Sequence, residues 1–234
     1  MRARQVAVLA TLLLTVALAG CEKSIPLDQS FWQARSARVG VALVKYPEPS
    51  AYRYGQEGLL DLAINEALAA PLKAFLRTAD LVPFGTRAER YVARLNERGF
   101  AARRLETPLD LAQFPTFEGP GDANFDRDLR RLAEAEGLDF LVVLSIEAVG
   151  TTRDYYGFIP LGPPRAICRA KGRLVDLRSN ALRWQAFTAG EEAVVRVEGD
   201  WDQPPQYPNL GRALQKAIEQ AAEFLEKQFF AQGS

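Results

Sequence analysis

The run from Leu138 to Val149 constrains the fold more than any other part of the chain. It is almost continuously apolar, and glycines stand at both ends, Gly137 and Gly150. A strand with one face in water alternates apolar and polar residues, whereas a continuous apolar run is typical of a strand covered on both faces. The run therefore predicts a central strand with structure packed on each side of the sheet.

The residues before this run predict one strand and two helices. Val39, Val41 and Leu43 alternate as a first strand, which the prolines of Tyr46-Pro47-Glu48-Pro49 should end. An apolar stripe at helical spacing predicts a helix from Leu59 to about Ala79, and Pro71 should kink or split it. Thr86-Arg87-Ala88-Glu89 matches a capping box and predicts the start of a second helix, which Gly99 should stop.

The middle of the chain predicts a short strand from Ala101 to Leu105, a long loop over 106–123 and a helix from about Phe125 to Glu136. After the central run, Arg165 to Leu177 alternates again, which predicts a strand with one face in water. Its outward residues are expected to be Arg165, Arg169, Lys171 and Arg173.

The last part of the chain predicts hairpin strands and a closing helix. A turn at Arg178-Ser179-Asn180-Ala181 leads into Leu182-Arg183-Trp184, and a further strand should bury Ala193, Val195 and Val197. The closing helix is expected from Asn209 to about Ala231. The order of elements predicts an α/β fold, a mixed sheet flanked by helices, in a single domain over 37–234 that ends in a C-terminal helix.

The first residues have the layout of a signal peptide. Arg2 and Arg4 precede an uncharged run from Val6 to Leu18, which at about 1.5 Å per residue reaches only about 20 Å of a hydrocarbon core about 30 Å thick. The sequence then reads Leu18-Ala19-Gly20-Cys21 and resembles the lipobox of bacterial lipoproteins. That resemblance implies a signal peptide over 1–20, acyl chains such as palmitate on Cys21, and a lipidated tether over 21–36.

Two alternatives to the lipid anchor remain open. Ala17-Leu18-Ala19 also fits an ordinary signal peptidase site, which would release a soluble periplasmic protein that begins at Gly20, and the segment could stay as an uncleaved anchor.

The residue after Cys21 bears on the membrane to which the protein is sorted. It is Glu22 and not an aspartate. The resemblance to lipoproteins of Gram-negative bacteria therefore implies sorting to the outer membrane, with the domain on its periplasmic face.

Composition narrows the chemistry. The chain contains no histidine, which removes the commonest general base and the commonest metal ligand. With Cys21 lipidated, Cys168 is the only remaining thiol, so we expect no internal disulfide and no zinc site. We expect no cofactor and no enzymatic activity. Removing 1–20 takes away two of the 29 basic residues and none of the 29 acidic ones, a balance that argues against nucleic acid. We expect Cys168 to be a small buried apolar residue.

Two groups of acidic residues are candidate sites. The series Asp122, Asn124, Asp126, Asp128 resembles the opening of a calcium loop, but Arg127 replaces the required glycine and Ala133 the closing glutamate, so we expect no metal. The alternative function is a periplasmic carboxylate-dependent enzyme that acts on cell-wall glycans, with a sugar stacked on Trp201. Its candidate carboxylates are Glu191, Glu192, Glu198, Asp200 and Asp202.

The segment from Gly150 to Pro164 is the predicted contact surface. It is interpreted as a loop stiffened by Pro160, Pro163 and Pro164, and it concentrates apolar side chains where loops normally present polar ones. The candidate contact residues are Tyr155, Tyr156, Phe158, Ile159 and Leu161. Three alternatives stay open: partner docking, insertion into a membrane interface, and folding back over the sheet edge.

A looser resemblance covers roughly the second half of the chain. The passage from Leu129 through the buried strand to Gly172-Arg173-Leu174-Val175-Asp176-Leu177 and Trp184 resembles the periplasmic domain of several lipoprotein families. These are the curli-secretion lipoproteins, the lipoprotein activators of penicillin-binding proteins, and the amino-terminal domain of the Tol system's propeller protein. The resemblance implies a fold and a binding or scaffolding role in an envelope assembly or transport complex. It implies no functional residues, and the partner is an unidentified envelope protein or a second copy of the chain.

Overall fold

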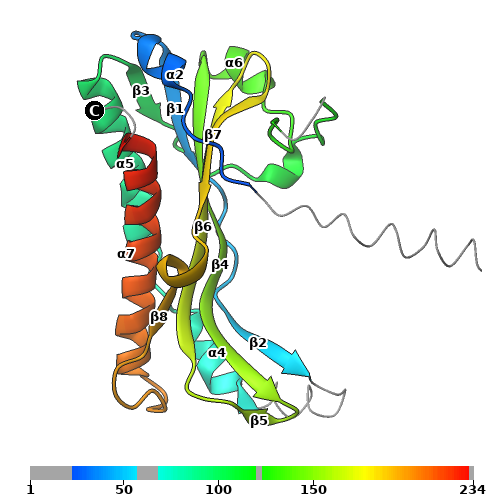
Figure 1. The fold of residues 1–234 in the computed structure, drawn as a ribbon, viewed down its shortest axis with the longest axis vertical. Helices are drawn as coiled ribbons and strands as arrows, with labels where there is room; N and C mark the ends of the chain where they lie inside the picture. The colour runs from blue at the N-terminus through cyan, green and yellow to red at the C-terminus, as the bar shows by residue number, and fades with distance from the viewer. Residues whose placement is uncertain (1–22, 57–67, 120–122, 232–234) are drawn as a thin grey trace, which may run out of the picture.

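The structure, a computed structural model, describes residues 23–56, 68–119 and 123–231, and it is an α/β fold built on one mixed sheet (Figure 1). The sheet runs in the order β3 (Ala101–Arg104), β1 (Arg38–Leu43), β4 (Phe140–Tyr156), β6 (Arg165–Asp176) and β7 (Ala181–Phe187). β3, β1 and β4 are parallel, and β4, β6 and β7 are antiparallel. The predicted mixed sheet and the predicted central strand are therefore confirmed.

β4 and β6 extend beyond their first neighbours and form the lower half of an elongated molecule (Figure 1). There, β2 (Ser50–Gln56) pairs in parallel with 150–156 of β4, along the same edge that β1 occupies higher up. β8 (Val194–Arg196) similarly takes over from β7 on the outer edge of β6. β2 was not predicted from the sequence.

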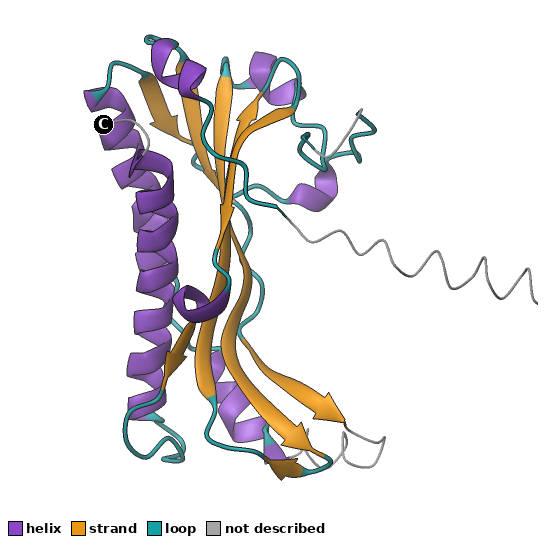
Figure 2. Cartoon of the chain, viewed as in Figure 1, coloured by secondary structure: helices purple, strands orange, loops and turns teal. Residues whose placement is uncertain are grey.

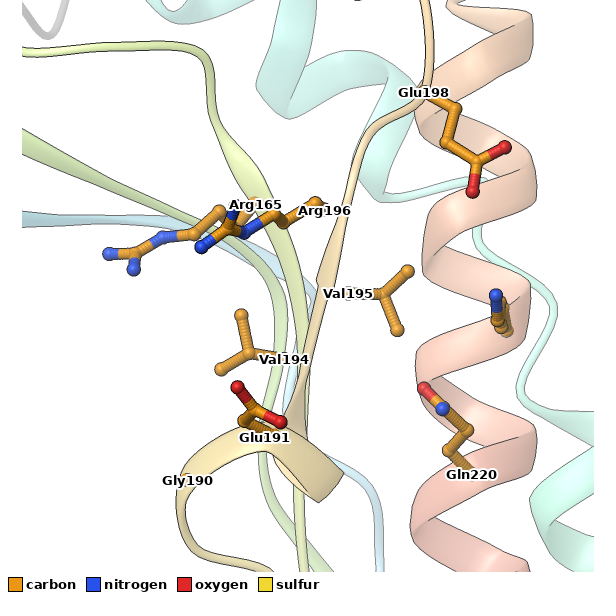
Figure 3. A pocket seen from close by; sticks show the side chains of 9 residues that line it. Arg165, Gly190, Glu191, Val194, Val195, Arg196, Glu198 and Gln220 are labelled. Atoms are coloured by element: carbon orange, nitrogen blue, oxygen red, sulfur yellow. The ribbon is translucent and has the colours of Figure 1, made fainter.

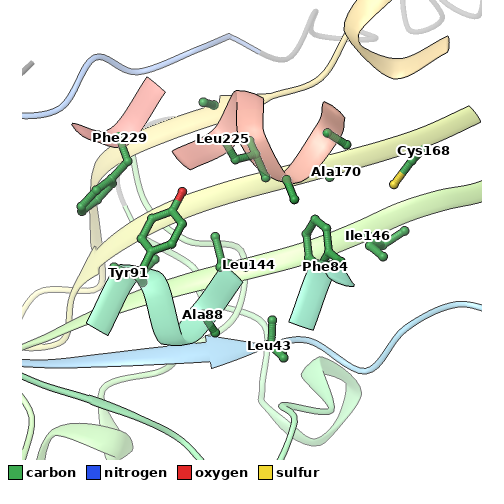
Figure 4. Packing of buried hydrophobic residues seen from close by; sticks show 14 of the residues in the cluster. Leu43, Phe84, Ala88, Tyr91, Leu144, Ile146, Cys168, Ala170, Leu225 and Phe229 are labelled. Atoms are coloured by element: carbon green, nitrogen blue, oxygen red, sulfur yellow. The ribbon is translucent and has the colours of Figure 1, made fainter. Parts of the chain in front are cut away.

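Two helices cover one face of the sheet (Figure 2). α5 (Val82–Glu97) and α7 (Pro208–Phe230) pack their apolar stripes against it, and the main core lies between them and the strands (Figure 4). Trp184, Tyr91 and Phe229 are among its largest fully buried side chains, and the Trp184 and Phe229 rings meet edge to face with their centroids 4.9 Å apart. The closing helix and its buried stripe agree with the prediction from Asn209 to Ala231.

The opposite face of the upper sheet is covered by chain between β3 and β4. This stretch includes η1 (Leu111–Gln113) and α6 (Arg131–Ala135), and it builds a second core from Phe125, Leu129, Leu141 and Val175 among others. Since β4 has a core on each side, alternating residues such as Leu141 and Val142 are both fully buried. That double burial is the reason for the continuous apolar run in the sequence.

The residues predicted as a tether pack onto the domain from Lys23 onward. The backbone N–H of Ile25 donates to the Gln185 carbonyl of β7, and the Gln185 N–H donates back, both at 2.9 Å. α2 (Gln29–Gln33) follows, and Phe31 is buried, with its ring stacked on Phe100 at 4.7 Å between centroids. Residues 23–36 therefore leave no free spacer in the described part of this segment.

The predicted helix starts at Thr86 and at Phe125 were wrong. α5 begins at Val82, with Pro83 in its first turn and Asp80 accepting a hydrogen bond from the Val82 N–H. Thr86 therefore lies inside the helix, where its hydroxyl donates back to the Pro83 carbonyl instead of forming a capping box. The start of the helix predicted from Leu59 to about Ala79 lies in 57–67, outside the described residues; the rest of it contains α4 (Ala70–Leu76), which carries Pro71 in its first turn.

The helix predicted from Phe125 begins only at Arg131. Buried Asn180 holds the preceding residues in an extended path: its side-chain oxygen accepts from the Leu129 N–H at 3.0 Å, and its amide nitrogen donates to the carbonyls of Phe125 and Arg127. These bonds use backbone groups that a helix would need. The predicted hairpin turn containing Asn180 is confirmed, and this residue adopts a φ of 62°.

The prediction that one face of β6 is in water holds only in part. Lys171 is buried and the Arg173 side chain nearly so, because the second core and its loops cover that face. Arg173 pairs with Asp126 at 3.1 Å and lies over the Phe125 ring, while Lys171 lies 3.6 Å from Glu147. Among the helices of the described residues, none has the length and apolar character needed to span a bilayer.

Candidate functional site

The predicted contact segment forms a strand end and a tight hairpin instead of a loop. Residues 150–156 continue β4, because β2 pairs along one of its edges, and β6 as far as Thr152 and then β5 pair along the other. Gly157 and Phe158 then form a two-residue turn into β5 (Ile159–Pro160), with Gly157 at a φ of 61°, the left-handed conformation such turns require. We call residues 155–161 the tip.

The tip exposes large apolar side chains to solvent. Tyr156, Phe158, Ile159 and Leu161 are each 52% to 67% exposed, and Tyr155 is half-buried. Of the three alternatives for this segment, folding back over the sheet edge does not describe these four side chains. Tyr54 on neighbouring β2 and Leu68 before α4 are also exposed, so six of the seven large apolar side chains exposed in the described residues lie at one end of the molecule. The exception is Val82.

A pocket of about 360 Å³ lies directly behind the tip. Thr151, Arg153 and Tyr155 alternate along β4 and so point to the same face of the sheet, where they form its floor. Its other walls come from β2, the start of α4, and the loop before α7. The wall residues used below are Arg53, Phe158, Trp201, Asp202 and Tyr207.

Arg153 is the central polar group of this pocket. Its Nε donates to the Gly162 carbonyl at 2.5 Å, and its guanidinium carbon lies 4.9 Å from the Trp201 ring centroid and 5.8 Å from that of Tyr155. No carboxylate of the described residues forms an ion pair with Arg153. A cation–π contact of this kind restrains the guanidinium without using its N–H donors.

The pocket therefore combines aromatic walls with charged side chains. It is lined by Arg53, Arg153 and the carboxylate of Asp202. Tyr207 is buried at its base with its ring 5.2 Å from that of Phe75, which ties the loop before α7 to α4. Such a pocket can take an apolar group that carries a carboxylate.

A second hollow, of about 580 Å³, lies between β8, η2 (Gly190–Ala193) and α7 (Figure 3). It is lined by charges of both signs, and Glu191 and Glu198 lie at opposite ends of it (Figure 3). Glu192 instead accepts a hydrogen bond from the Ala189 N–H. Trp201 and Asp202 line the pocket behind the tip, so the carboxylates weighed for the glycan enzyme are divided between two places.

The remaining candidate residues form ion pairs, are buried in the core, or lie outside the described residues. Asp126 pairs with Arg173, and Asp128 pairs with Arg130 at 2.7 Å, while Asp122 lies outside the described residues. Cys168 is buried in the main core, and that burial raises the pKa of its thiol to about 12. Cys21 and the signal segment 1–20 also lie outside the described residues, so lipidation stays a prediction.

Sequence reasoning found the tip but missed the pocket. Arg153 was interpreted only as part of a loop, and Trp201 only as a platform beside acidic residues. The alternation of Thr151, Arg153 and Tyr155 was a usable signal for a strand with one functional face. The contribution of β2 had no such signal, because it depends on a parallel pairing across about a hundred residues of chain.

Comparisons with known proteins add structures of low similarity. No protein-family model and no curated protein matches the chain. A hypothetical protein of Chlamydia trachomatis, CT253, aligns with 84% of this chain and 99% of its own, at 13% identity and a TM-score of 0.37. The lipoprotein GNA1162 of Neisseria meningitidis aligns with 80% of this chain and 99% of its own, at 16% identity and a TM-score of 0.29. A Helicobacter pylori protein described as a neuraminyllactose-binding hemagglutinin homologue aligns with 92% of this chain and 90% of its own, at 11% identity and a TM-score of 0.36. These values assign the chain to no family.

Proposed function

We propose that this protein is a lipoprotein of the bacterial envelope that binds a partner protein through its tip. It is held by acyl chains on Cys21 at the periplasmic face of the outer membrane. The observation that carries the binding role is the gathering of exposed apolar side chains at the tip, with an aromatic, arginine-bearing pocket behind it. Exposed apolar groups scattered singly are ordinary, whereas a cluster at one place marks an interaction site.

The fold also supports a placement in which the tip is held away from the membrane that carries the anchor. The Lys23 carbonyl accepts a hydrogen bond from the Gln185 side chain, so only Glu22 separates Cys21 from chain fixed to β7. Two residues span at most about 7 Å, which would hold this part of the domain against the bilayer. Gln185 lies level with Val143 of β4, and from there to Tyr156 the strand runs roughly 40 Å at about 3.3 Å per residue.

The binding role is tested by Tyr156→Ala combined with Phe158→Ala. Partner capture from crosslinked envelopes should fall about thirtyfold, because aromatic anchors commonly contribute about 2 kcal/mol or more to an interface. Stability should stay within about 0.5 kcal/mol of wild type, since both side chains are largely exposed. Val82→Ala is the matched control, an equally exposed apolar residue outside the tip.

Four outcomes would count against this role. Unchanged capture by a stable double variant would remove the tip from the interface, and a large loss of melting temperature would show that the tip is packed structure. If the Cys21→Ser protein floats with neutral vesicles only while Tyr156 and Phe158 are intact, the tip inserts into a membrane instead. Glycan cleavage dependent on Glu192 or Glu198 would favour the enzyme.

The anchor is tested separately with a radioactive fatty acid. Wild-type protein should take up label, and Cys21→Ser should not. An unlabelled wild-type protein whose mature terminus is Gly20 would show ordinary secretion.

A further inference from the structure

Three arginines of α5 converge on one carboxylate of α7, far along the sheet from the tip. Glu226 Oε2 lies 3.0 Å from Arg87 Nη1, and its Oε1 lies 3.2 Å from Arg90 Nη2 and 3.1 Å from Arg94 Nη1. The arginines stand at spacings of three and four residues, which places them on one face of the helix. They line an open hollow of about 460 Å³ between the two helices.

The hollow holds more positive charge than the fold requires. The Glu226 side chain is only 5% exposed, and a buried carboxylate is costly unless it is paired, but one arginine is enough to compensate its charge. The other two leave a surplus of two positive charges. Lys227 and Glu223 also line the hollow, and their charges cancel, so the surplus stays at two.

The arginines keep donors for a ligand. A guanidinium carries five N–H groups, whereas Arg87 and Arg94 each donate one hydrogen bond to Glu226, through Nη1, and Arg90 approaches it with Nη2. The Arg90 side chain is 59% exposed, so most of its donors are accessible from the hollow. Arg94 lies with its guanidinium carbon 4.0 Å from the centroid of the Phe230 ring, which holds the plane of its fork.

We propose that this hollow binds a phosphate group that carries two negative charges. The charge of such a dianion equals the surplus, and arginine forks match phosphate oxygens with paired hydrogen bonds. The group can belong to free phosphate or to the headgroup of a phosphomonoester lipid, since both present the same oxygens. This site lies outside the tip and its pocket, so it goes beyond the proposed function and does not depend on it.

The test uses the full chain with Cys21→Ser, so that acyl chains do not themselves hold the protein on vesicles. Inorganic phosphate at low ionic strength should give a saturable isotherm by calorimetry, weakened about tenfold or more by Arg90→Ala, since a hydrogen bond between charged groups contributes about 1.5–3 kcal/mol. Arg77→Ala is the control, because its side chain is 63% exposed and also pairs with one glutamate, Glu48. It should leave binding unchanged.

A second arm distinguishes the two sources of phosphate. Phosphatidylcholine vesicles with and without phosphatidate are floated with the same proteins. Flotation that requires both phosphatidate and Arg90 assigns the site to a lipid headgroup, whereas an isotherm with phosphate and no flotation assigns it to a free ligand. Absence of both, or equal loss in Arg90→Ala and Arg77→Ala, overturns the proposal.

Glu226→Gln provides an independent measurement. It removes the internal negative charge, so phosphate binding should tighten in a variant whose circular dichroism matches wild type. Weaker binding by that folded variant would overturn the proposal, because it would show that Glu226 takes part in holding the ligand instead of competing with it.

Discussion

Replacing Asn180 should destabilise the fold far more than its place in a turn suggests. The side chain is fully buried, and it makes the three hydrogen bonds to the segment before α6 described above. Its backbone carbonyl also accepts from the Phe125 N–H at 3.0 Å. The residue thus attaches the second core to the hairpin between β6 and β7.

The expected loss follows from these bonds. Each is worth about 1 kcal/mol net, and buried partners left without a bond cost about 1–3 kcal/mol. Asn180→Ala should therefore lower the free energy of unfolding by about 3–5 kcal/mol. Asn180→Gly loses the same side-chain bonds but tolerates the φ of 62°, so it should be about 1 kcal/mol more stable than the alanine variant.

Urea unfolding of the three proteins, followed by fluorescence and circular dichroism, measures both differences. A loss below about 1 kcal/mol for Asn180→Ala would refute the reasoning, since it would mean that water replaces all three bonds. Equal stability of the alanine and glycine variants would refute the assigned backbone strain.

Three further predictions concern titratable groups. Burial raises the pKa of Cys168 to about 12, so in the Cys21→Ser protein this thiol should resist Ellman's reagent at pH 8 until urea is added; rapid native labelling would contradict its burial. The Tyr91 hydroxyl is buried with no hydrogen-bond partner among the described residues, and Tyr91→Phe should be neutral or stabilising by up to about 2 kcal/mol in urea unfolding; a clear loss would reveal a partner. Hydrogen bonds from Arg38 lower the pKa of Asp139, so their stabilisation is present above about pH 4 and lost as pH falls through the lowered pKa. Asp139→Asn should flatten the acid limb of stability against pH, and an unchanged limb would contradict this.

Local sequence patterns predicted the elements in which one apolar pattern continues over many residues. The continuous run before Gly150 identified the central strand, and the stripe ending at Phe229 identified α7. Both depend on periodicity sustained over many residues, which few alternative structures can satisfy.

Long-range contacts decided the features that the sequence did not predict. Thr86 has the chemistry of a helix cap, but Asp80 and Pro83 begin the helix earlier. Lys171 and Arg173 are charged residues that lie under the second core. For the candidate site, the apolar composition of the tip was visible, whereas the pocket required β2 and the loop carrying Trp201 to meet across the sheet.

The pairing of β6 with β7 has a mechanical consequence. The tip joins β4 to β6, whereas Ile25 is hydrogen-bonded to β7, so a pull exerted at the tip and resisted near Ile25 crosses the ladder between β6 and β7. This antiparallel register runs from Lys171 opposite Phe187 to Asp176 opposite Ala181, interrupted only by a bulge between Leu174 and Val175. The pull acts along the strands and loads this ladder in shear, so several hydrogen bonds must break together instead of one after another. The domain should stretch little under such a force and transmit it between its two ends.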